Sequence, residues 1–240
     1  MLVEVCANSL ESALNAEKAG ADRIELCSEL GVGGITPSYG LIAEVKKRLQ
    51  IPVHVLIRPR SGHFTYSEWD FEVMKNDITF CASMGVDGIV SGVLHADFSL
   101  DLERTSTLVH ASKPMKFTFH RAFDWIRNPL EALKQFEVIG VDYILTSGQE
   151  DSAEKGLKLL QELNKTSTKT KIMAGGGIRL ENAKKFKEAG LNAIHLSGTA
   201  FEQPLTMKPK IPMKSISYLN ENIVAVTNEV MVRQIIQSVK

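Results

Sequence analysis

Ionisable side chains stand where a buried strand is predicted to end, in the segment "TFHRAFD" (118–124). The apolar and aromatic residues just before it are typical of a strand. Charged groups are costly to bury without a partner, so their position here indicates a ligand site. We interpret His120 as a general acid or base, whereas we expect Arg121 and Asp124 to hold the loop that follows.

Other predicted strands also carry polar side chains at every second position, where the side chains of a strand share a face. If these faces point the same way, five ionisable groups converge on one site: Glu4, Glu25, Arg58, His120 and His195. Nearby carboxylates would then set the protonation state of His120, and such clusters usually mark functional sites. We therefore predict catalytic roles for Glu25, His120 and Glu4. Mutual neutralisation of Glu and Arg in a core is the alternative.

Segments rich in glycine and small residues follow two further strand-like runs, "AGGGI" (174–178) and "SGTAF" (197–201). Backbone N–H groups can approach an anion closely where side chains are small. We therefore predict phosphate or another anion there, although such segments also simply turn the chain. The residues predicted to contact this ligand are Arg58, Arg60, Ser147, Gly175, Gly176, Gly177, His195 and Ser197.

The three cysteines, Cys6, Cys27 and Cys81, are widely spaced and form no CxxC pair. An odd number of separated cysteines argues against a disulfide framework and indicates a reducing compartment. Thiolates and imidazoles are soft ligands that suit Cu(I) or Zn(II), which makes Cys27 and Cys6 candidate metal ligands. Packing as small buried hydrophobes is the alternative for these cysteines.

The overall composition restricts the partners of the protein. Among its 240 residues, 28 basic and 28 acidic side chains cancel, so neither nucleic acid nor a membrane surface is an expected partner. No apolar stretch approaches the ~18 residues of a membrane span. The first strand-like run begins at Leu2, which leaves no room for a signal peptide. We expect a cytoplasmic protein.

Four segments share a pattern of glycine, a small apolar residue, Asp or Asn, a variable residue and isoleucine. In each, the glycine suits a helix C-cap, because it adopts positive φ without penalty, and a buried strand is predicted after it. Four more strand-like runs lie halfway between these segments. The repeats are "AGADRIEL" (19–26), "MGVDGIVS" (84–91), "IGVDYILT" (139–146) and "AGLNAIHL" (189–196), and the intervening runs are 2–8, 51–59, 115–123 and 171–178.

Helix-start signals support an alternation of strands and helices. Capping-box spacing predicts starts near Asn8 with Glu11, Ser67 with Asp70 and Asp151 with Glu154, and Asn128 before Pro129 predicts another. Eight strands alternating with helices over this length predict a TIM (β/α)8 barrel. An open doubly wound sheet is the alternative, but the equivalence of alternate strands favours the closed barrel.

We predict that residues 1–240 form one domain, with the barrel elements at about 2–201. The Pro- and Lys-rich segment that follows is expected to be irregular, within a terminal region at about 202–240. A closing helix is predicted over 227–240, capped at Thr227 or Asn228.

Five segments of the sequence together closely resemble the CutC family, which is named for copper homeostasis. The resemblance covers about residues 2–200. The segments are "EVCANSLESALNAEKAGADRIELCSELGVGGITPSYG" (4–40), "IRPRSGHFTYSEWDFEVMKNDI" (57–78), "DGIVSGVL" (87–94), "TFHRAFD" (118–124) and "LTSGQ" (145–149). The resemblance implies a cytoplasmic TIM barrel, a homodimer or higher homo-oligomer, and Cu(I) binding in which Cys27 and Cys6 are the ligands.

The sequence departs from the family pattern at three positions. His63 stands where Asp is usual, Ser61 where Gly is usual, and Tyr143 where Arg is common. Two functions stay open. One is copper homeostasis through Cu(I) binding. The other is an enzyme acting on a small anionic or phosphorylated substrate, with His120 as acid or base and Arg58 holding the anion.

Overall fold

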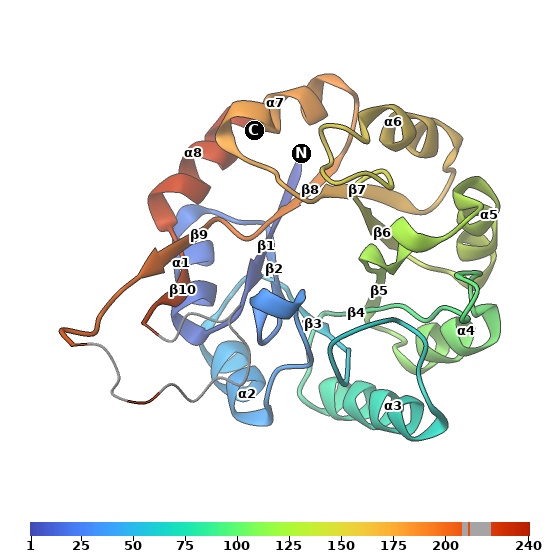
Figure 1. The fold of residues 1–240 in the computed structure, drawn as a ribbon, viewed down its shortest axis with the longest axis horizontal. Coiled ribbons are helices and arrows are strands. Elements are labelled where there is room, and N and C mark those ends of the chain that lie inside the picture. The colour runs from blue at the N-terminus through green and yellow to red at the C-terminus, as the bar shows by residue number, and fades with distance from the viewer. Residues whose placement is uncertain (208–210, 212–221) are drawn as a thin grey trace.

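The computed structural model describes residues 1–207, Ile211 and 222–240. Eight parallel strands pair in chain order, and β8 pairs with β1, which closes the barrel (Figure 1). The predicted TIM barrel is thereby confirmed and the open sheet is excluded. The barrel strands are β1 Leu2–Ala7, β2 Arg23–Leu26, β3 Val53–Leu56, β4 Gly88–Ser91, β5 Lys116–Phe119, β6 Tyr143–Thr146, β7 Lys171–Gly175 and β8 Ala193–Leu196.

Helices connect the strands and form the outer ring (Figure 1). They are α1 Leu10–Ala19, α2 Tyr39–Arg48, α3 Glu68–Ser83, α4 Leu102–Ala111, α5 Pro129–Ile139, α6 Leu157–Thr166, α7 Leu180–Glu188 and α8 Glu229–Val239. Two 3-10 turns, η1 Leu30–Val32 and η2 Arg121–Trp125, lie in the loops after β2 and β5.

The helix boundaries confirm two of the predicted start signals. Ser67 and Asp70 form a reciprocal capping box at α3. Asn128 occupies the N-cap position of α5 ahead of Pro129, without a side-chain hydrogen bond to the helix. The glycine repeat also has its expected role, because Gly20 ends α1 with φ 91° and Gly140 ends α5 with φ 84°.

One predicted capping residue and one predicted helix start are wrong. Ser9 caps α1 through its hydroxyl, while the Asn8 side chain accepts from Ser12 and donates to the carbonyl of Ala225. Helix α6 begins at Leu157 rather than near Asp151, because the loop after β6 continues across that stretch. Asp151 instead pairs with Lys155.

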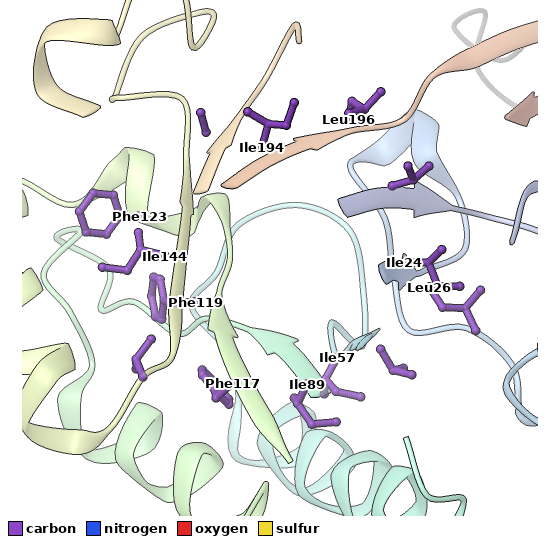
Figure 2. Packing of buried hydrophobic residues seen from close by; sticks show 14 of the residues in the cluster. Ile24, Leu26, Ile57, Ile89, Phe117, Phe119, Phe123, Ile144, Ile194 and Leu196 are labelled. Atoms are coloured by element: carbon purple, nitrogen blue, oxygen red, sulfur yellow. The ribbon is translucent and has the colours of Figure 1, made fainter. Parts of the chain in front are cut away.

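Alternate side chains of each strand point to opposite sides of the barrel wall, either outward to the helices or inward to the barrel interior. Residues that point outward are apolar and pack against the helices, as Figure 2 shows for Ile89 and Phe117 near the ring of helices. On the other parity, β1 and β2 carry Glu4, Arg23 and Glu25, which are buried. The main hydrophobic core is therefore the layer between sheet and helices, and the barrel interior is rich in polar groups.

The C-terminal region contains a strand pair that was not predicted. Strand β9 (Thr199–Glu202) pairs antiparallel with β10 (Val224–Thr227). Strand β10 lies in the stretch between about 202 and the closing helix that was expected to be irregular, and for these residues that expectation is wrong. Most of the Pro- and Lys-rich segment lies outside the described residues. Helix α8 follows, capped by Asn228 as predicted, and lies between α7 and α1 in the outer ring (Figure 1).

Within the part of the chain that the structure describes, no helix combines the length and apolar character needed to cross a membrane.

The loop after β6 depends on two glycines in close contact. A Cβ atom added to Gly156 would overlap the carbonyl oxygen of Ser147. Gly156→Ala is therefore expected to lower the free energy of unfolding by about 1–3 kcal/mol in urea denaturation, because backbone must move to relieve the overlap. Gly40→Ala is the control, since a Cβ there meets no atom within 4 Å and Gly40 lies inside α2. Equal stability of the two variants would contradict this interpretation.

Candidate functional site

Two cysteine sulfurs meet at the C-terminal ends of β1 and β2. The strand register places Cys6 beside Glu25, and Cys27 follows directly after β2. The two Sγ atoms are 3.4 Å apart and both side chains are buried. A single soft metal ion is small enough to contact both sulfurs after a slight adjustment of the side chains.

A carboxylate and an imidazole extend this pair. Atoms of Cys6, Glu25 and His195 that could each donate to a metal lie within 4.8 Å of one another. The Cys6 thiol is 3.9 Å from Glu25 Oε1, and His195 Nδ1 is 3.9 Å from Glu25 Oε2. Sulfur, imidazole and carboxylate thus converge from three adjacent strands, β8, β1 and β2.

Deeper in the barrel, Glu4 links this cluster to Arg23. The Arg23 Nε atom lies 2.5 Å from Glu4 Oε2, and His195 Nδ1 lies 2.7 Å from Glu4 Oε1. Arg23 also stacks over the ring of Tyr143, 4.0 Å from its centroid. Glu4 therefore fixes the orientation of the His195 ring and leaves Nε2 as the ring nitrogen available to a ligand.

The pKa of Glu4 is lowered, whereas the pKa values of Glu25 and His195 are raised. Burial alone would raise the pKa of Glu4, but the Arg23 guanidinium and the His195 hydrogen bond lower it to about 2. Burial raises the pKa of Glu25 to about 7, although the charge of His195 opposes the shift. Burial alone would lower the pKa of His195, but Glu25 and Glu4 raise it above its usual value. Glu4 is thus a permanent anion, whereas Glu25 titrates near neutrality.

The Cys6 thiol holds its proton tightly. Its pKa is raised well above the usual range by the hydrogen bond with Cys27, by burial and by the charge of Glu25. A metal ion that binds Cys6 must displace this proton, because the thiolate is the ligand.

His120 is uncharged at neutral pH. Burial and the charge of Arg58 lower its pKa to about 3. Its Nδ1 atom accepts the Ala122 N–H, so the proton of the neutral ring is on Nε2. That Nε2 atom is buried and has no partner among the described residues. The ring of Phe64 packs against it, with centroids 4.8 Å apart.

Two arginines predicted to bind an anion make contacts with loop carbonyls. Arg58 donates to the carbonyls of Val32 and Gly34, which holds the η1 loop over Cys27. Arg60 donates to the carbonyl of Thr65 and pairs with Asp70. These contacts favour a role for both arginines in positioning loops.

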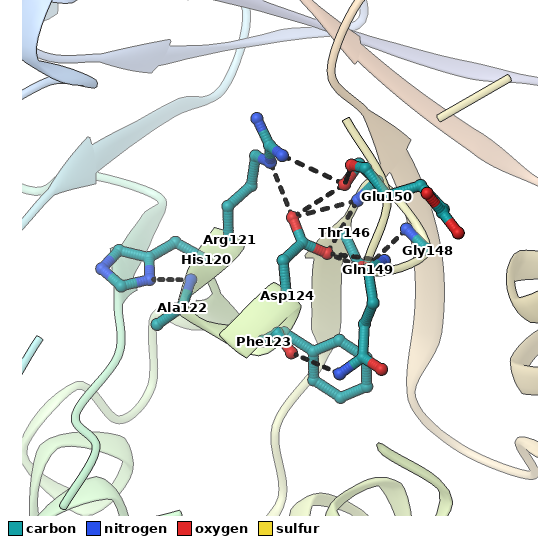
Figure 3. A network of polar contacts seen from close by, with 10 residues as sticks. His120, Arg121, Ala122, Phe123, Asp124, Thr146, Gly148, Gln149 and Glu150 are labelled. Atoms are coloured by element: carbon teal, nitrogen blue, oxygen red, sulfur yellow. Dashed lines mark hydrogen bonds and ion pairs between the residues drawn. The ribbon is translucent and has the colours of Figure 1, made fainter. Parts of the chain in front are cut away.

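The loops after β5 and β6 are joined through one carboxylate. Asp124 accepts from Arg121 Nε, from the Thr146 hydroxyl and from the backbone N–H groups of Ser147 and Gln149 (Figure 3). Arg121 also donates to the Ser147 hydroxyl at 3.0 Å. The expected structural role of Arg121 and Asp124 agrees with these bonds, but the network also directs the Arg121 guanidinium toward a cavity.

This cavity, of about 940 Å³, opens at the C-terminal end of the barrel. Predicted residues that line it come from strand ends (Cys6, Glu25, Arg58, His120 and His195) and from loops (Gly176, Gly177 and Ser197). Of the other predicted residues, Glu4, Cys27, Arg60, Ser147 and Gly175 do not line it. Sequence reasoning missed Arg179, Asn228 and Gln234 in its wall.

The fold and this site define a TIM-barrel protein with a buried pair of thiols at the C-terminal mouth, next to an imidazole and a carboxylate. The model of the CutC family matches residues 1–200. The chain belongs to the CutC family.

Relatives and solved structures agree with this membership. The family protein CutC of Proteus mirabilis is 47% identical, over 91% of this chain and 88% of the relative. That of Edwardsiella ictaluri is 48% identical, over 82% and 78%. A solved structure from Streptococcus agalactiae, described as a proposed copper homeostasis protein CutC, is 32% identical with a TM-score of 0.79, covering 82% of this chain and 98% of that one.

More distant barrels share only the fold. A thiamine phosphate pyrophosphorylase from Pyrococcus furiosus is 14% identical with a TM-score of 0.61, covering 99% of this chain and 95% of that one.

Proposed function

We propose that the protein acts in copper homeostasis by binding Cu(I) at Cys6 and Cys27. The observation that carries this proposal is the 3.4 Å contact between their sulfur atoms in a buried site at the barrel mouth. Two thiols at this distance form a donor set suited to a soft monovalent ion. The name of the Streptococcus relative supports the same role.

The groups around the thiols fit a cuprous ion. Two thiolates and one Cu(I) carry a net negative charge, and a protonated His195 beside them would offset it. If the imidazole is instead neutral, its Nε2 atom is available as a third ligand. Glu4 holds the ring in either case, which is the usual role of a carboxylate behind a metal-binding histidine.

The alternative function, catalysis on a small anionic substrate, is not better supported by the comparisons. Catalytic roles for Glu25, His120 and Glu4 stay predictions. A homo-oligomeric state, a cytoplasmic location and the assignment of residues 1–240 to one domain also stay predictions.

An anaerobic Cu(I) competition titration tests the proposal. The wild-type protein is expected to withdraw Cu(I) from a strong chelator at a fixed stoichiometry. Cys27→Ser and Cys6→Ser should each weaken binding by at least about tenfold, because each removes a soft ligand. Cys81→Ser is the matched control, since Cys81 is a buried thiol in α3, away from the site.

The proposal fails if the wild type does not compete with the chelator. It also fails if Cys81→Ser weakens binding as much as Cys27→Ser does, because copper would then bind to thiols without regard to this site.

A further inference from the structure

Arg121 presents a guanidinium edge to the cavity in a fixed orientation. Its Nε atom is held by Asp124 at 2.7 Å and its Nη2 atom by Ser147 at 3.0 Å. The Nη1 atom lies over the loop after β7, where a Cβ atom on Gly176 would come within 3.4 Å of it. The side chain is 46% exposed and lines the cavity. A restrained guanidinium with one edge open is suited to bind an anion.

The loop after β7 lies beneath Arg121 and has features suited to an anion. We call Gly176, Gly177 and the start of α7 the anion cradle. Gly176 and Gly177 have φ values of 108° and 77°, which let the backbone turn without side chains in the way. Helix α7 starts three residues after Gly177. The N–H of Asn182 bonds the carbonyl of Arg179, whereas the N–H groups of Leu180 and Glu181 have no partner within the helix. They carry a partial positive charge directed at the cavity end.

Two charged side chains stand at the rim of this cradle. Arg179, which precedes α7, is exposed and lines the cavity. Glu181, in the first turn of α7, also lines the cavity and opposes an anion. Asp124 pairs with Arg121, so Arg121 and Arg179 are balanced by Asp124 and Glu181, and the helix start supplies the remaining positive potential.

A second, independent feature of the cavity requires a partner. The Nε2–H group of His120 is a buried donor, since the residue is 6% exposed and Nε2 has no partner among the described residues. His120 lines the same cavity as Arg121 and Gly176. A buried donor without an acceptor keeps the full cost of its desolvation, and an acceptor oxygen of a ligand would remove that cost.

We propose that the cavity binds a small phosphorylated organic molecule. Its phosphate group would lie between Arg121, Arg179 and the Gly176–Gly177 loop, and a carbonyl or hydroxyl oxygen of its organic part would accept from His120 Nε2. The ligand uses none of the sulfur atoms, so this site stands whether or not copper binds at Cys6 and Cys27. A volume of about 940 Å³ is ample for such a metabolite.

Isothermal titration of the copper-free protein with glycerol 3-phosphate tests the site, with inorganic phosphate and glycerol as comparison ligands. Glycerol 3-phosphate should bind and glycerol should not. Arg179→Gln should weaken binding by about tenfold, because a charge-assisted contact is lost. Lys184→Gln is the control, since it removes the same charge from the exposed surface of α7.

Arg121→Gln should weaken binding at least as much as Arg179→Gln does. Arg121→Gln also disturbs the Asp124 network and could prevent folding. In that case the result for Arg179→Gln decides the test. His120→Phe should weaken the binding of glycerol 3-phosphate but leave the binding of inorganic phosphate unchanged.

Three outcomes would overturn the proposal. One is that neither phosphate compound binds at millimolar concentration. Another is that Lys184→Gln and Arg179→Gln weaken binding equally. The third is that glycerol 3-phosphate binds no better than inorganic phosphate and is indifferent to His120→Phe, in which case no organic ligand is recognised.

Discussion

Arg23→Met is expected to lower the free energy of unfolding by about 3–5 kcal/mol, because it leaves a buried carboxylate without its cation. Arg23 is 4% exposed, and its Nε atom lies 2.5 Å from the fully buried Glu4. Methionine keeps most of the apolar stem of the side chain, so the loss is mainly of charge. His195 alone would remain beside Glu4.

Urea denaturation at neutral pH measures this effect, and Arg48→Met is the matched control. Arg48 pairs with Glu44 on the surface of α2, and both side chains are more than 40% exposed. Loss of that pair is expected to cost no more than about 1 kcal/mol. If Arg23→Met were no more destabilising than Arg48→Met, the interior pair would not contribute as its burial implies.

The pH dependence of the same variant gives a second test. In the wild type, the pKa of Glu4 is lowered to about 2, so its contribution to stability is present above the unfolded pKa of about 4.5 and is lost as the pH falls toward 2. Arg23→Met removes the main group that lowers this pKa. The difference in stability between wild type and variant should therefore shrink below about pH 4.

The affinity for Cu(I) is expected to rise at least about a hundredfold between pH 6 and pH 8, since displacement of the Cys6 proton alone gives this factor. The pKa of Cys6 is raised well above its usual range by the Cys27 hydrogen bond and by burial, so the thiol is protonated across this interval. Cu(I) must displace that proton, and each unit of pH lowers the competing proton concentration tenfold.

Competition titrations at several pH values check this slope, with allowance for the proton affinity of the chelator. In Cys6→Ser, Cu(I) binding should release about one proton fewer, because the serine hydroxyl has no proton to release in this range. The remaining affinity should therefore rise less steeply with pH than in the wild type. Cys81→Ser should keep the wild-type slope. A flat profile in the wild type would mean that Cys6 is not a ligand.

The barrel could be predicted because its repeating unit is local. Gly20 ends α1 and Gly140 ends α5, and in each case the next strand begins within a few residues. Strand parity also placed Glu25 and His195 on the inner face, since alternation within one strand needs no knowledge of its neighbours. The β9–β10 pair was missed because its strands lie more than 20 residues apart in the sequence.

The site was predictable only in part because its contacts depend on register and on loop paths. The approach of Cys6 to Cys27 follows from the pairing of β1 with β2, which no short sequence pattern specifies. Arg23 was missed, although it shares parity with Glu25 and could have been found by that rule. The contacts of Arg58 follow from the path of the η1 loop, which folds back over Cys27.

The placement of α8 bears on the shape of the cavity. Residues 1–200 match the family model, whereas Asn228 and Gln234, which form part of the cavity wall, belong to the segment beyond it. Helix α8 packs between α7 and α1 and completes the ring of helices, so the wall that it adds to the cavity belongs to the barrel itself. A substitution at Gln234 can therefore reshape the cavity from the outer ring and leave the thiols at the ends of β1 and β2 in place.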